Sequence, residues 1–302
     1  MIQVLLSAYN GERYLEPQLD SVLAQDVAGL SVLVRDDGST DSTPMLLERY
    51  AAQHSSIRLL RGENIGFARS FLHLLERSSA EARYVAFCDQ DDVWQPGKLS
   101  RAIDVLRTHP ENIPTLYCSR LTVVDERLSR LGSSRIPRRG LSFQNALVEN
   151  GIAGCTMLMN RSARGILLRA MPDTLVAHDW WVYLIVSAFG TVCFDPEPRI
   201  LYRQHGSNVF GLRLGPMQRL LYKIGRYRRI GRFQPVVRQA EELDRLYGSS
   251  LPESARGVLR RFVHGCRKRP FGRFCYACSG EIYRQSALDN LVLKALITLK
   301  RL

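Results

Sequence analysis

Short apolar runs alternate with amphipathic segments along the first hundred residues of the chain. The runs cover residues 2–9, 31–34, 57–60 and 84–88. Between them, apolar side chains recur at helical spacing, as at Leu15, Leu19 and Val22, and again at residues 67–75. Repeated strand and helix units with continuously apolar strands predict a mostly parallel sheet covered by helices on both faces.

The pattern continues less regularly after residue 98. An amphipathic helix is expected to about residue 108, and another helix opens at Asp179 in "HDWWVYLIVSAFG". Strands are expected at residues 115–125, 151–160, 191–195 and 200–202. Beyond residue 210 the pattern becomes helical, basic and uneven.

Polar residues gather where each predicted strand ends. The clusters are Tyr9-Asn10, Asp36-Asp37-Gly38-Ser39, Asn64-Ile65-Gly66 and Asp89-Gln90-Asp91-Asp92. In open α/β sheets the ligand site lies outside the carboxyl ends of the strands. We therefore expect all four clusters to converge on one rim.

The segment "FCDQDDVW" holds three carboxylates, those of Asp89, Asp91 and Asp92, within four residues. Carboxylates this close raise one another's pKa values, and a divalent cation removes the conflict. Oxygen ligands suit Mg²⁺ or Mn²⁺, completed by water and substrate phosphates. An acidic turn that caps the next helix is the simpler alternative.

Asp36 and Asp37 stand at the end of the second apolar run. Acidic residues at that point accept hydrogen bonds from ribose hydroxyls in other nucleotide-binding sheets, so a nucleotide contact is expected. A helix cap or a turn before "STDST" is the alternative.

Composition narrows the class of protein. Apolar residues make up 45% and charged residues 24% of the 302 positions, as in soluble globular proteins. No stretch reaches the roughly 18 to 20 apolar residues that span a bilayer. The chain enters its first apolar run without a basic region or a cleavage site, and its seven cysteines are scattered, so a cytoplasmic location is expected.

Positive charge is concentrated in the last third of the chain. Residues 211–302 hold 20 Lys and Arg and 6 Asp and Glu; subtraction from the totals of 42 and 29 leaves 22 and 23 for residues 1–210. Two domains are predicted, a near-neutral catalytic one at residues 1–210 and a basic, mainly helical one at residues 211–302.

The basic region interleaves cations with Leu, Ile, Tyr and Phe at residues 216–233, and a second basic stretch at residues 256–270 extends it. This pattern is typical of an interfacial helix on an anionic membrane surface, so peripheral attachment to the inner face of the cell membrane is expected. A solvated helical face is the alternative. Nucleic acid is not expected as a partner, because the region carries no recognised nucleic-acid-binding motif.

Four segments together resemble the family 2 glycosyltransferases, which are inverting enzymes with the GT-A fold. They are "VLLSAYNGERYLEPQLDSVLAQ", "VLVRDDGSTDST", "NIGFARSFLHLL" and "FCDQDDVWQPGKL". The ordered match covers roughly residues 1–210. It implies an α/β fold of the GT-A class, with a Rossmann-like, mixed but mostly parallel sheet flanked by helices, here followed by a basic helical extension.

The resemblance implies a role for each cluster. The nucleotide or donor would be bound by Ser7, Ala8, Tyr9, Asn10, Asp36, Asp37, Asn64, Gly66, Arg69, Asp89 and Gln90. Asp37 would hold the base or ribose, and Arg69 would offset diphosphate charge. Asp91 and Asp89 would ligate the cation, and Asp92 would support them.

The family's general base is an acid at a helix start. This chain has His178-Asp179 there, followed by Trp180 and Trp181, so the first acid of the family pattern is replaced by histidine. The resemblance assigns the base to Asp179, which would take the proton of the acceptor hydroxyl. Simple capping of the helix is the alternative.

A histidine late in the domain, in "YRQHGSN", resembles the element that completes the metal shell or touches the diphosphate. His205 is accordingly a predicted metal ligand, although a lone histidine is more often structural. Acceptor or supporting roles are predicted for Asp92, Trp94, His178, Trp180, Trp181 and Gln204.

The forms "DQDDVW", "GCTM", "HDWW" and "YRQHGSN" are similar to bacterial rhamnosyltransferase-like members of the family. The donor implied is a nucleotide-diphosphate sugar such as dTDP-L-rhamnose, and the acceptor a lipid-linked or growing cell-surface glycan. Two other classes stay open at this point. One is a metal-dependent phosphatase or nucleotidyltransferase, and the other is an inactive, basic scaffold that binds membrane or nucleic acid.

Overall fold

The computed structural model describes residues 1–205 and 234–302 of the chain. The chain divides into two compact units, which we describe separately. The first, here called the sheet unit, comprises Met1–Ile136, Ile152–Arg169 and Gly190–Asn208; the second, the helical unit, comprises Pro137–Gly151, Ala170–Phe189 and Val209–Leu302. The domain division predicted at residue 210 lies outside the described residues and stays a prediction.

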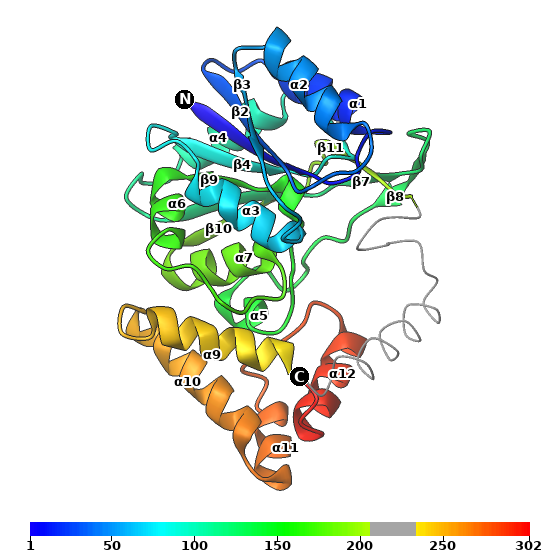
Figure 1. The fold of residues 1–302 in the computed structure, drawn as a ribbon. Coiled ribbons are helices and arrows are strands. Elements are labelled where there is room, and N and C mark those ends of the chain that lie inside the picture. Colours follow the sequence, from blue (N-terminus) through cyan, green and yellow to red (C-terminus); the bar gives the residue numbers. More distant parts are fainter. Residues whose placement is uncertain (206–233) are drawn as a thin grey trace. The chain divides into compact units, whose positions relative to one another are not determined.

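A seven-stranded sheet forms the centre of the sheet unit, in the order β10-β6-β9-β4-β1-β2-β3 (Figure 1). The strands are β1 (Ile2–Ala8), β2 (Leu30–Asp36), β3 (Ile57–Arg61), β4 (Tyr84–Cys88), β6 (Thr115–Ser119), β9 (Leu158–Asn160) and β10 (Thr191–Asp195). All pairs are parallel except those that β9 makes with β4 and β6. The predicted mostly parallel sheet is confirmed.

The order of the strands reverses beside β1. From β1 the chain moves outward to β2 and β3, then returns to place β4 on the other side of β1. Such a reversal leaves a crevice at the carboxyl ends of the two strands that flank it, here β1 and β4. The segments "YN" and "DQDD" follow these two strands.

A smaller four-stranded sheet extends this end of the sheet unit, in the order β5-β11-β7-β8. Its strands are β5 (Val93–Trp94), β7 (Thr122–Val124), β8 (Arg130–Ser133) and β11 (Ile200–Arg203). The single strand expected over residues 115–125 is therefore two strands in different sheets. The Arg120 amide still donates to the Asp195 carbonyl of β10, whereas the next amide, that of Leu121, donates to the Ser134 hydroxyl and so leaves the first sheet.

The strand expected over residues 151–160 is shorter than predicted. Only Leu158–Asn160 pairs as β9, and Gly154–Thr156 forms a 3₁₀ turn, η1, instead. The Thr156 hydroxyl and amide both donate to the Ala153 carbonyl, at 2.7 and 3.0 Å, which closes this turn. A threonine side chain that bonds the nearby backbone competes with a strand ladder in this way.

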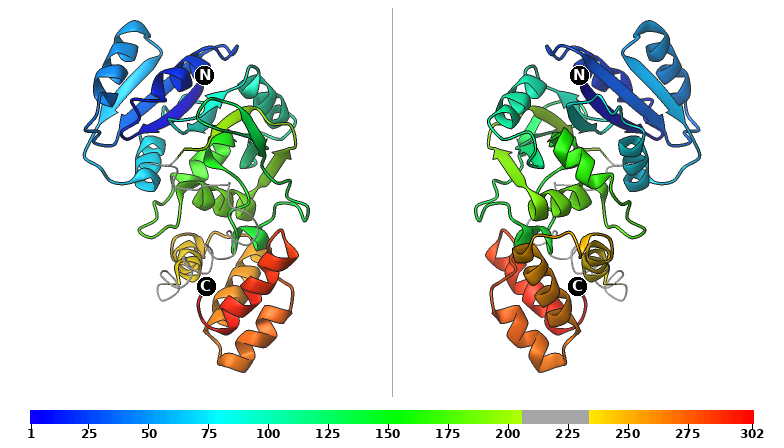
Figure 2. Two further views of the ribbon diagram at one scale, coloured as in Figure 1. Left: turned by 90° about the vertical axis from the view of Figure 1, so that its right-hand side faces the viewer. Right: turned by 90° about the vertical axis from the view of Figure 1, so that its left-hand side faces the viewer.

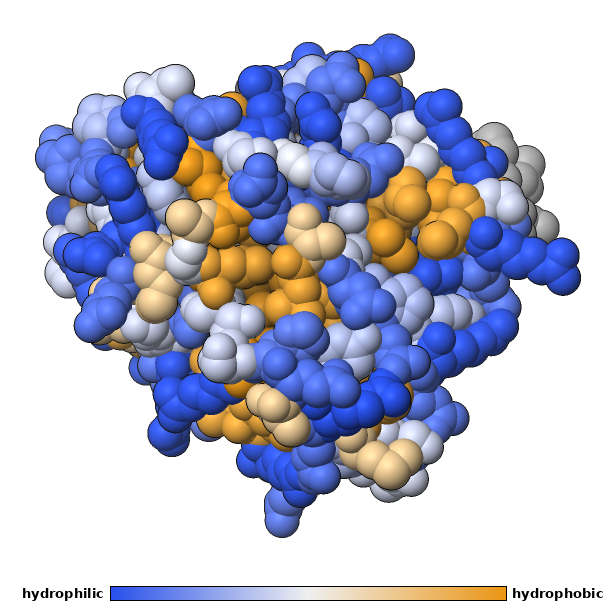
Figure 3. All heavy atoms as spheres, turned by 90° about the horizontal axis from the view of Figure 1, so that it is seen from above, coloured by the Kyte–Doolittle hydropathy of each residue, from blue (hydrophilic) through white to orange (hydrophobic). Residues whose placement is uncertain are grey.

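Helices cover both faces of the large sheet, with α1 and α2 on one face and α3 on the other (Figure 1). The helices of the sheet unit are α1 (Leu15–Leu23), α2 (Thr43–Gln53), α3 (Phe67–Glu76), α4 (Lys98–Arg107) and α6 (Arg161–Leu167). Leu15, Leu19 and Val22 of α1 are fully buried, as their helical spacing predicts. On the face that Figure 3 shows, hydrophilic side chains predominate and apolar ones form separate patches.

The helical unit contains α5 (Phe143–Ala146), α7 (His178–Phe189), α9 (Pro235–Tyr247), α10 (Glu253–Arg267), α11 (Pro270–Cys278) and α12 (Ala287–Thr298), seen from two sides in Figure 2. Trp181, Leu243, Tyr247 and Phe262 are buried in it. The helical pattern predicted beyond residue 210 is confirmed for residues 234–302, whereas residues 216–233 lie outside the described part. Among the described helices, none is long and apolar enough to cross a membrane.

Candidate active site

Gln90, the middle residue of the "DQD" segment, ties the end of β4 to the end of β1. Its side-chain oxygen accepts a hydrogen bond from the Tyr9 amide at 2.8 Å, and its nitrogen donates to the Tyr9 carbonyl at 3.0 Å. The Gln90 side chain thus bonds to the Tyr9 backbone in the way that the backbone of a neighbouring strand would. Gly11 makes room for it, because a Cβ at that position would collide with the Gln90 side-chain oxygen.

The other two clusters join the same rim. Asn10 donates its amide to the Ser39 hydroxyl at 2.9 Å, and its side-chain oxygen accepts from the Thr40 amide at 2.8 Å. Asp37 accepts from the amides of Ile65 and Gly66, at 2.9 and 3.0 Å. The expected convergence of the four polar clusters is confirmed.

Asp37 is held by a buried ion pair. Its carboxylate accepts from the Arg35 guanidinium, and both side chains are almost fully buried. Arg35 also donates to Ser70 at 3.1 Å, and the Ser70 hydroxyl lies 2.6 Å from that of Ser7. This network links β1, β2 and the start of α3. Asp37 therefore shapes the Asn64–Gly66 loop, and its predicted nucleotide contact stays a prediction.

The remaining donor residues border this network. Asp36 is buried and accepts from the Ser39 amide at 3.2 Å. Ala8 is fully buried, whereas Tyr9 is 45% exposed. Gly66 precedes α3 with φ +83°, a conformation that favours glycine, and Arg69 is exposed in the first turn of that helix.

The carboxylates of the "DQDD" segment have different surroundings. Asp89 and Asp91 are half-buried, whereas Asp92 is fully buried. Ligand atoms of Asp89, Asp92 and Cys155 all lie within 4.8 Å of one another. Burial raises the pKa of the Asp92 carboxyl well above its usual value, and the charges of Asp91 and Asp89 raise it further. A protonated or cation-paired Asp92 is the state that such a site favours.

His205 meets Asp91 directly. Its Nε2 lies 2.8 Å from the Asp91 Oδ2, and its ring lies 4.9 Å from that of Tyr14. Two residues predicted as metal ligands from distant parts of the chain are therefore neighbours. Gln204, next to His205, donates its amide to the Val124 carbonyl at 2.9 Å, which continues the β11–β7 pairing.

Arg203 brings β11 to the acidic segment. Its Nε donates to the Asp91 carbonyl at 2.9 Å, and its amide donates to the Asp92 Oδ1 at 3.2 Å. The guanidinium also donates to the Glu126 carbonyl at 2.6 Å and lies over the Tyr14 ring. Arg203 thus positions both Asp91 and the neighbouring His205.

Lys98 is a buried cation behind the acidic segment. Its ammonium lies 3.6 Å from the centre of the Trp94 ring, and both side chains are almost completely buried. Burial lowers the pKa of Lys98 to about 8, against the effect of the nearby Asp92 charge. Trp94 packs in the hydrophobic core, so its support for the site is structural.

The donor atoms fit a hard divalent cation. The predicted ligands stand in two groups among the described residues: the Asp91 carboxylate contacts the His205 imidazole, whereas the Asp89 carboxylate is clustered with Asp92 and Cys155. Cys155 is a poor ligand for such a cation, because burial and the Asp92 charge raise the pKa of its thiol well above the usual value. Carboxylate-rich sites of this kind suit Mg²⁺ or Mn²⁺.

The helix-start residues belong to the helical unit. Asp179 lies half-buried in the first turn of α7, where its Oδ1 accepts from the Trp180 amide at 2.7 Å. His178 is buried, and burial lowers its pKa to about 4. Trp180 donates its indole N–H to the Ala146 carbonyl at 2.6 Å, and Trp181 is in the core of the unit. Both tryptophans are therefore structural anchors of α7.

Sequence reasoning missed Arg35, Lys98, Arg203 and Cys155. Each lies inside a quoted motif, in "VRDD", "PGKL", "YRQH" and "GCTM". A charged residue within an otherwise apolar or strand-like run is the signal that could have indicated the first three, because a buried charge needs a partner.

Comparison with known proteins agrees with these observations. The model of a family described as Glycosyl transferase family 2 matches residues 3–165. An uncharacterized protein of Mycobacterium tuberculosis is 29% identical over 213 residues, which cover 69% of this chain and 60% of that protein. The dTDP-rhamnosyl transferase RfbG of Shigella flexneri is 27% identical over 223 residues, covering 68% of this chain and 73% of that protein. The chain thus spans about 60% of the length of its mycobacterial relatives.

Solved structures show the same fold at low identity. Residues 1–349 of S. aureus TarS, in complex with UDP-GlcNAc, superpose with a TM-score of 0.61 at 15% identity, covering 99% of this chain and 89% of that one. The mannosyltransferase PcManGT from Pyrobaculum calidifontis, in complex with GDP-Man and Mn²⁺, superposes with a TM-score of 0.57 at 18% identity. The match covers 99% of this chain and 85% of that one. The fold is GT-A, and the chain belongs to glycosyl transferase family 2.

Proposed function

We propose that the chain transfers a sugar from a nucleotide-diphosphate donor to an acceptor hydroxyl, with inversion at the anomeric carbon. The observation that carries this proposal is the Asp91–His205 contact of 2.8 Å, in the acidic segment that follows β4 next to the end of β1. A strand-order reversal with carboxylates and an imidazole on its rim suits a nucleotide diphosphate and its cation.

The nucleotide would lie along the ends of β1 and β2. Tyr9 is the exposed aromatic side chain at the end of β1, and Asn10, Asp36 and Asp37 line the same rim. The Asn64–Gly66 loop and the exposed Arg69 would border the diphosphate. TarS in complex with UDP-GlcNAc and PcManGT in complex with GDP-Man support a donor of this class.

Asp89, Asp91 and His205 would hold the divalent cation, with Asp92 and Arg203 supporting them. Mg²⁺ or Mn²⁺ bound there supplies positive charge for the departing diphosphate. The Mn²⁺ in the PcManGT complex supports this assignment. The chain's own part would be to fix the acidic segment, which Gln90 joins to the Tyr9 backbone and Arg203 joins to β11.

Asp179 would act as the general base. In one displacement the acceptor oxygen bonds to the anomeric carbon, the bond from that carbon to the diphosphate oxygen breaks, and the acceptor proton passes to the Asp179 carboxylate. The support is the resemblance of the His178-Asp179 helix start to the family's base motif, together with a carboxylate that is only half-buried.

The product would be a cell-surface glycan. Relatives include RfbG, named a dTDP-rhamnosyl transferase, and Bacillus subtilis TuaG, named a putative teichuronic acid biosynthesis glycosyltransferase. A dTDP-L-rhamnose donor, a lipid-linked or growing glycan acceptor and peripheral attachment to the inner membrane face are the finer parts of the proposal. Its supports are these relatives and the excess of cations in residues 211–302.

Calorimetric titration with UDP, dTDP and GDP, each with and without Mn²⁺, tests the proposal. We expect one nucleotide to bind in a metal-dependent way, and Asp91→Asn to abolish that dependence. Asp104→Asn, an exposed carboxylate on α4, is the matched control and should bind like the wild type. If no nucleotide binds to folded protein, the donor-site assignment is wrong. If a nucleotide binds equally well without Mn²⁺ and in Asp91→Asn, only the cation-site assignment is wrong.

A further inference from the structure

Helix α12 is apolar on two opposite sides. Leu293, Leu296 and Ile297 are buried, whereas Leu288 and Leu291 are 56% and 65% exposed, and Leu299, directly after the helix, is 67% exposed. Residues at positions 288, 291, 295 and 299 follow a helical stripe, and Ala295 between them is exposed as well. A surface helix of a globular unit normally has polar residues on its solvent-facing side. The exposed apolar stripe of α12 therefore indicates contact with an apolar partner.

Helix α11, which packs against α12, adds two aromatic side chains. Phe271 and Phe274, three residues apart, are 79% and 53% exposed. Among the described residues, six large apolar side chains are more than half exposed; four of them lie on these two helices and a fifth, Leu299, directly follows α12. We call these five residues, Phe271, Phe274, Leu288, Leu291 and Leu299, the α11–α12 surface. Arg273 joins the two helices by donating to the Thr298 carbonyl at 2.9 Å.

The surroundings of this surface are strongly basic. Residues 267–301 contain eight Lys and Arg but only two acids, Glu281 and Asp289, a net charge of about +6. The exposed cations among them are Arg267, Lys268, Arg269, Lys294, Lys300 and Arg301. Leu and Phe side chains flanked by such cations are the composition of an interfacial membrane-binding element.

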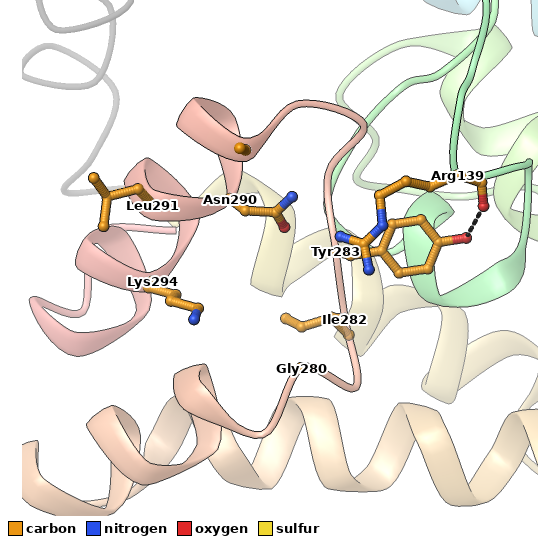
Figure 4. Close-up of a pocket in the computed structure, with 8 residues that line it drawn as sticks. Arg139, Gly280, Ile282, Tyr283, Asn290, Leu291 and Lys294 are labelled. Atoms are coloured by element: carbon orange, nitrogen blue, oxygen red, sulfur yellow. Dashed lines mark hydrogen bonds between the residues drawn. The ribbon is translucent and has the colours of Figure 1, made fainter.

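A pocket of about 450 Å³ opens beside α12 in the same unit. Ile282 and Leu291 provide apolar walls, and the cations Arg139 and Lys294 lie around it (Figure 4). Arg139 is held there, because its guanidinium lies 4.2 Å from the centre of the Tyr283 ring and its carbonyl accepts from the Tyr283 hydroxyl. Leu291 and Lys294 belong to the pocket and to the neighbourhood of the α11–α12 surface at once.

We infer that the α11–α12 surface docks on an anionic lipid bilayer, with the pocket taking the phosphate of one lipid head group. This inference rests on the membrane attachment in the proposed function and names the surface that performs it. A second copy of the chain fits less well, because a symmetric contact would bring the two sets of cations together. Nucleic acid would use the cations but leave the five apolar side chains exposed to water.

Co-sedimentation of the full chain with phosphatidylcholine vesicles, with and without phosphatidylglycerol, tests the inference. The wild type should bind only the anionic vesicles and retain part of that binding at high salt, since apolar insertion is not screened. The double variant Leu288→Gln/Leu291→Gln should lose binding by about tenfold or more at any salt concentration. Lys294→Gln should weaken binding chiefly at low salt.

Met45→Gln is the control, because Met45 is an equally exposed apolar side chain (66%) on α2 of the sheet unit, and it should bind like the wild type. Wild-type binding that survives the double variant would overturn the surface and leave membrane attachment standing. No wild-type binding to anionic vesicles would overturn both, and metal-dependent nucleotide titration of the same preparation shows separately whether the donor site stands. Concentration-dependent dimerisation lost in the double variant would instead assign the surface to self-association and overturn the inference.

Discussion

The side-chain amide of Gln90 hydrogen-bonds both backbone groups of Tyr9, 81 residues away in the chain. Through this pair the acidic turn after β4 is hydrogen-bonded to the segment after β1, so the predicted cation site and the predicted nucleotide site are directly connected. The middle position of a "DxD" segment is usually written as variable, yet here its side chain sets the distance between the two sites.

Replacing Gln90 by alanine should weaken nucleotide binding without unfolding the protein. Two hydrogen bonds are lost at about 1 kcal/mol each, so we expect the nucleotide dissociation constant to rise by up to about thirtyfold. Calorimetry measures the change, and Gln53→Ala, an exposed glutamine at the end of α2, is the control. Unchanged affinity would show that the Gln90 pair has no role in binding.

Gly11→Ala should lower stability and nucleotide affinity strongly only in a protein that retains Gln90. The added Cβ would meet the Gln90 side-chain oxygen, so the single variant should lose stability and nucleotide affinity, whereas Gly11→Ala in a Gln90→Ala background should cost much less. A double-mutant cycle by thermal unfolding and calorimetry measures this coupling. Additive effects would mean that the two residues do not share the space.

Arg203→Lys should loosen the acidic turn. Lysine keeps the charge but cannot donate to both the Asp91 and the Glu126 carbonyls, nor stack on Tyr14 in the same way. We expect a loss of about 2–4 kcal/mol in unfolding free energy and weaker Mn²⁺ dependence of nucleotide binding. Arg127→Lys, at an exposed position before β8, should match the wild type in both measurements.

Asp179→Asn should separate binding from chemistry. Asparagine keeps the Oδ1 acceptor for the Trp180 amide, so the start of α7 should be retained, whereas the amide cannot take a proton. Turnover should fall by about 10²–10⁴-fold with donor affinity nearly unchanged. Asp26→Asn, an exposed acid, is the control. Near-normal turnover of Asp179→Asn would remove it as the base.

His178 should make the protein less stable in acid. Burial lowers its folded pKa to about 4, below the usual value near 6.5, so the unfolded chain binds the proton more readily. Its contribution is therefore fully present above pH ~6.5 and is lost as the pH falls toward 4, by up to about 3 kcal/mol. Urea unfolding across this range should show a shallower pH dependence for His178→Gln than for the wild type.

The control for that measurement is His264→Gln. His264 is exposed on α10 of the same unit, so its removal should leave the pH profile of unfolding unchanged. Equal slopes for the wild type and His178→Gln would mean that His178 binds its proton equally well in the folded and unfolded states.

The sequence by itself determined the alternation of strands and helices over residues 1–108 and the polar clusters at four strand ends. This was possible because apolar periodicity and turn residues are local signals that survive in any tertiary context. Local signals failed at residues 115–125 and 151–160, where a chain that pairs as strand passes between two sheets or closes a turn around Thr156.

The tertiary structure alone decided how the site is held together. The Asp91 carboxylate contacts the His205 ring, and the Gln90 side chain hydrogen-bonds the Tyr9 backbone. Arg203 of β11 hydrogen-bonds the acidic turn. These partners are 81 to 114 residues apart in the chain. Asp92 and Lys98 are both buried, and they contact β11 through the Arg203 amide and β5 through the Trp94 ring. Sequence motifs name the residue types that a site needs, whereas burial and hydrogen-bond partners depend on which strands lie side by side, and strand order is a non-local property of the chain.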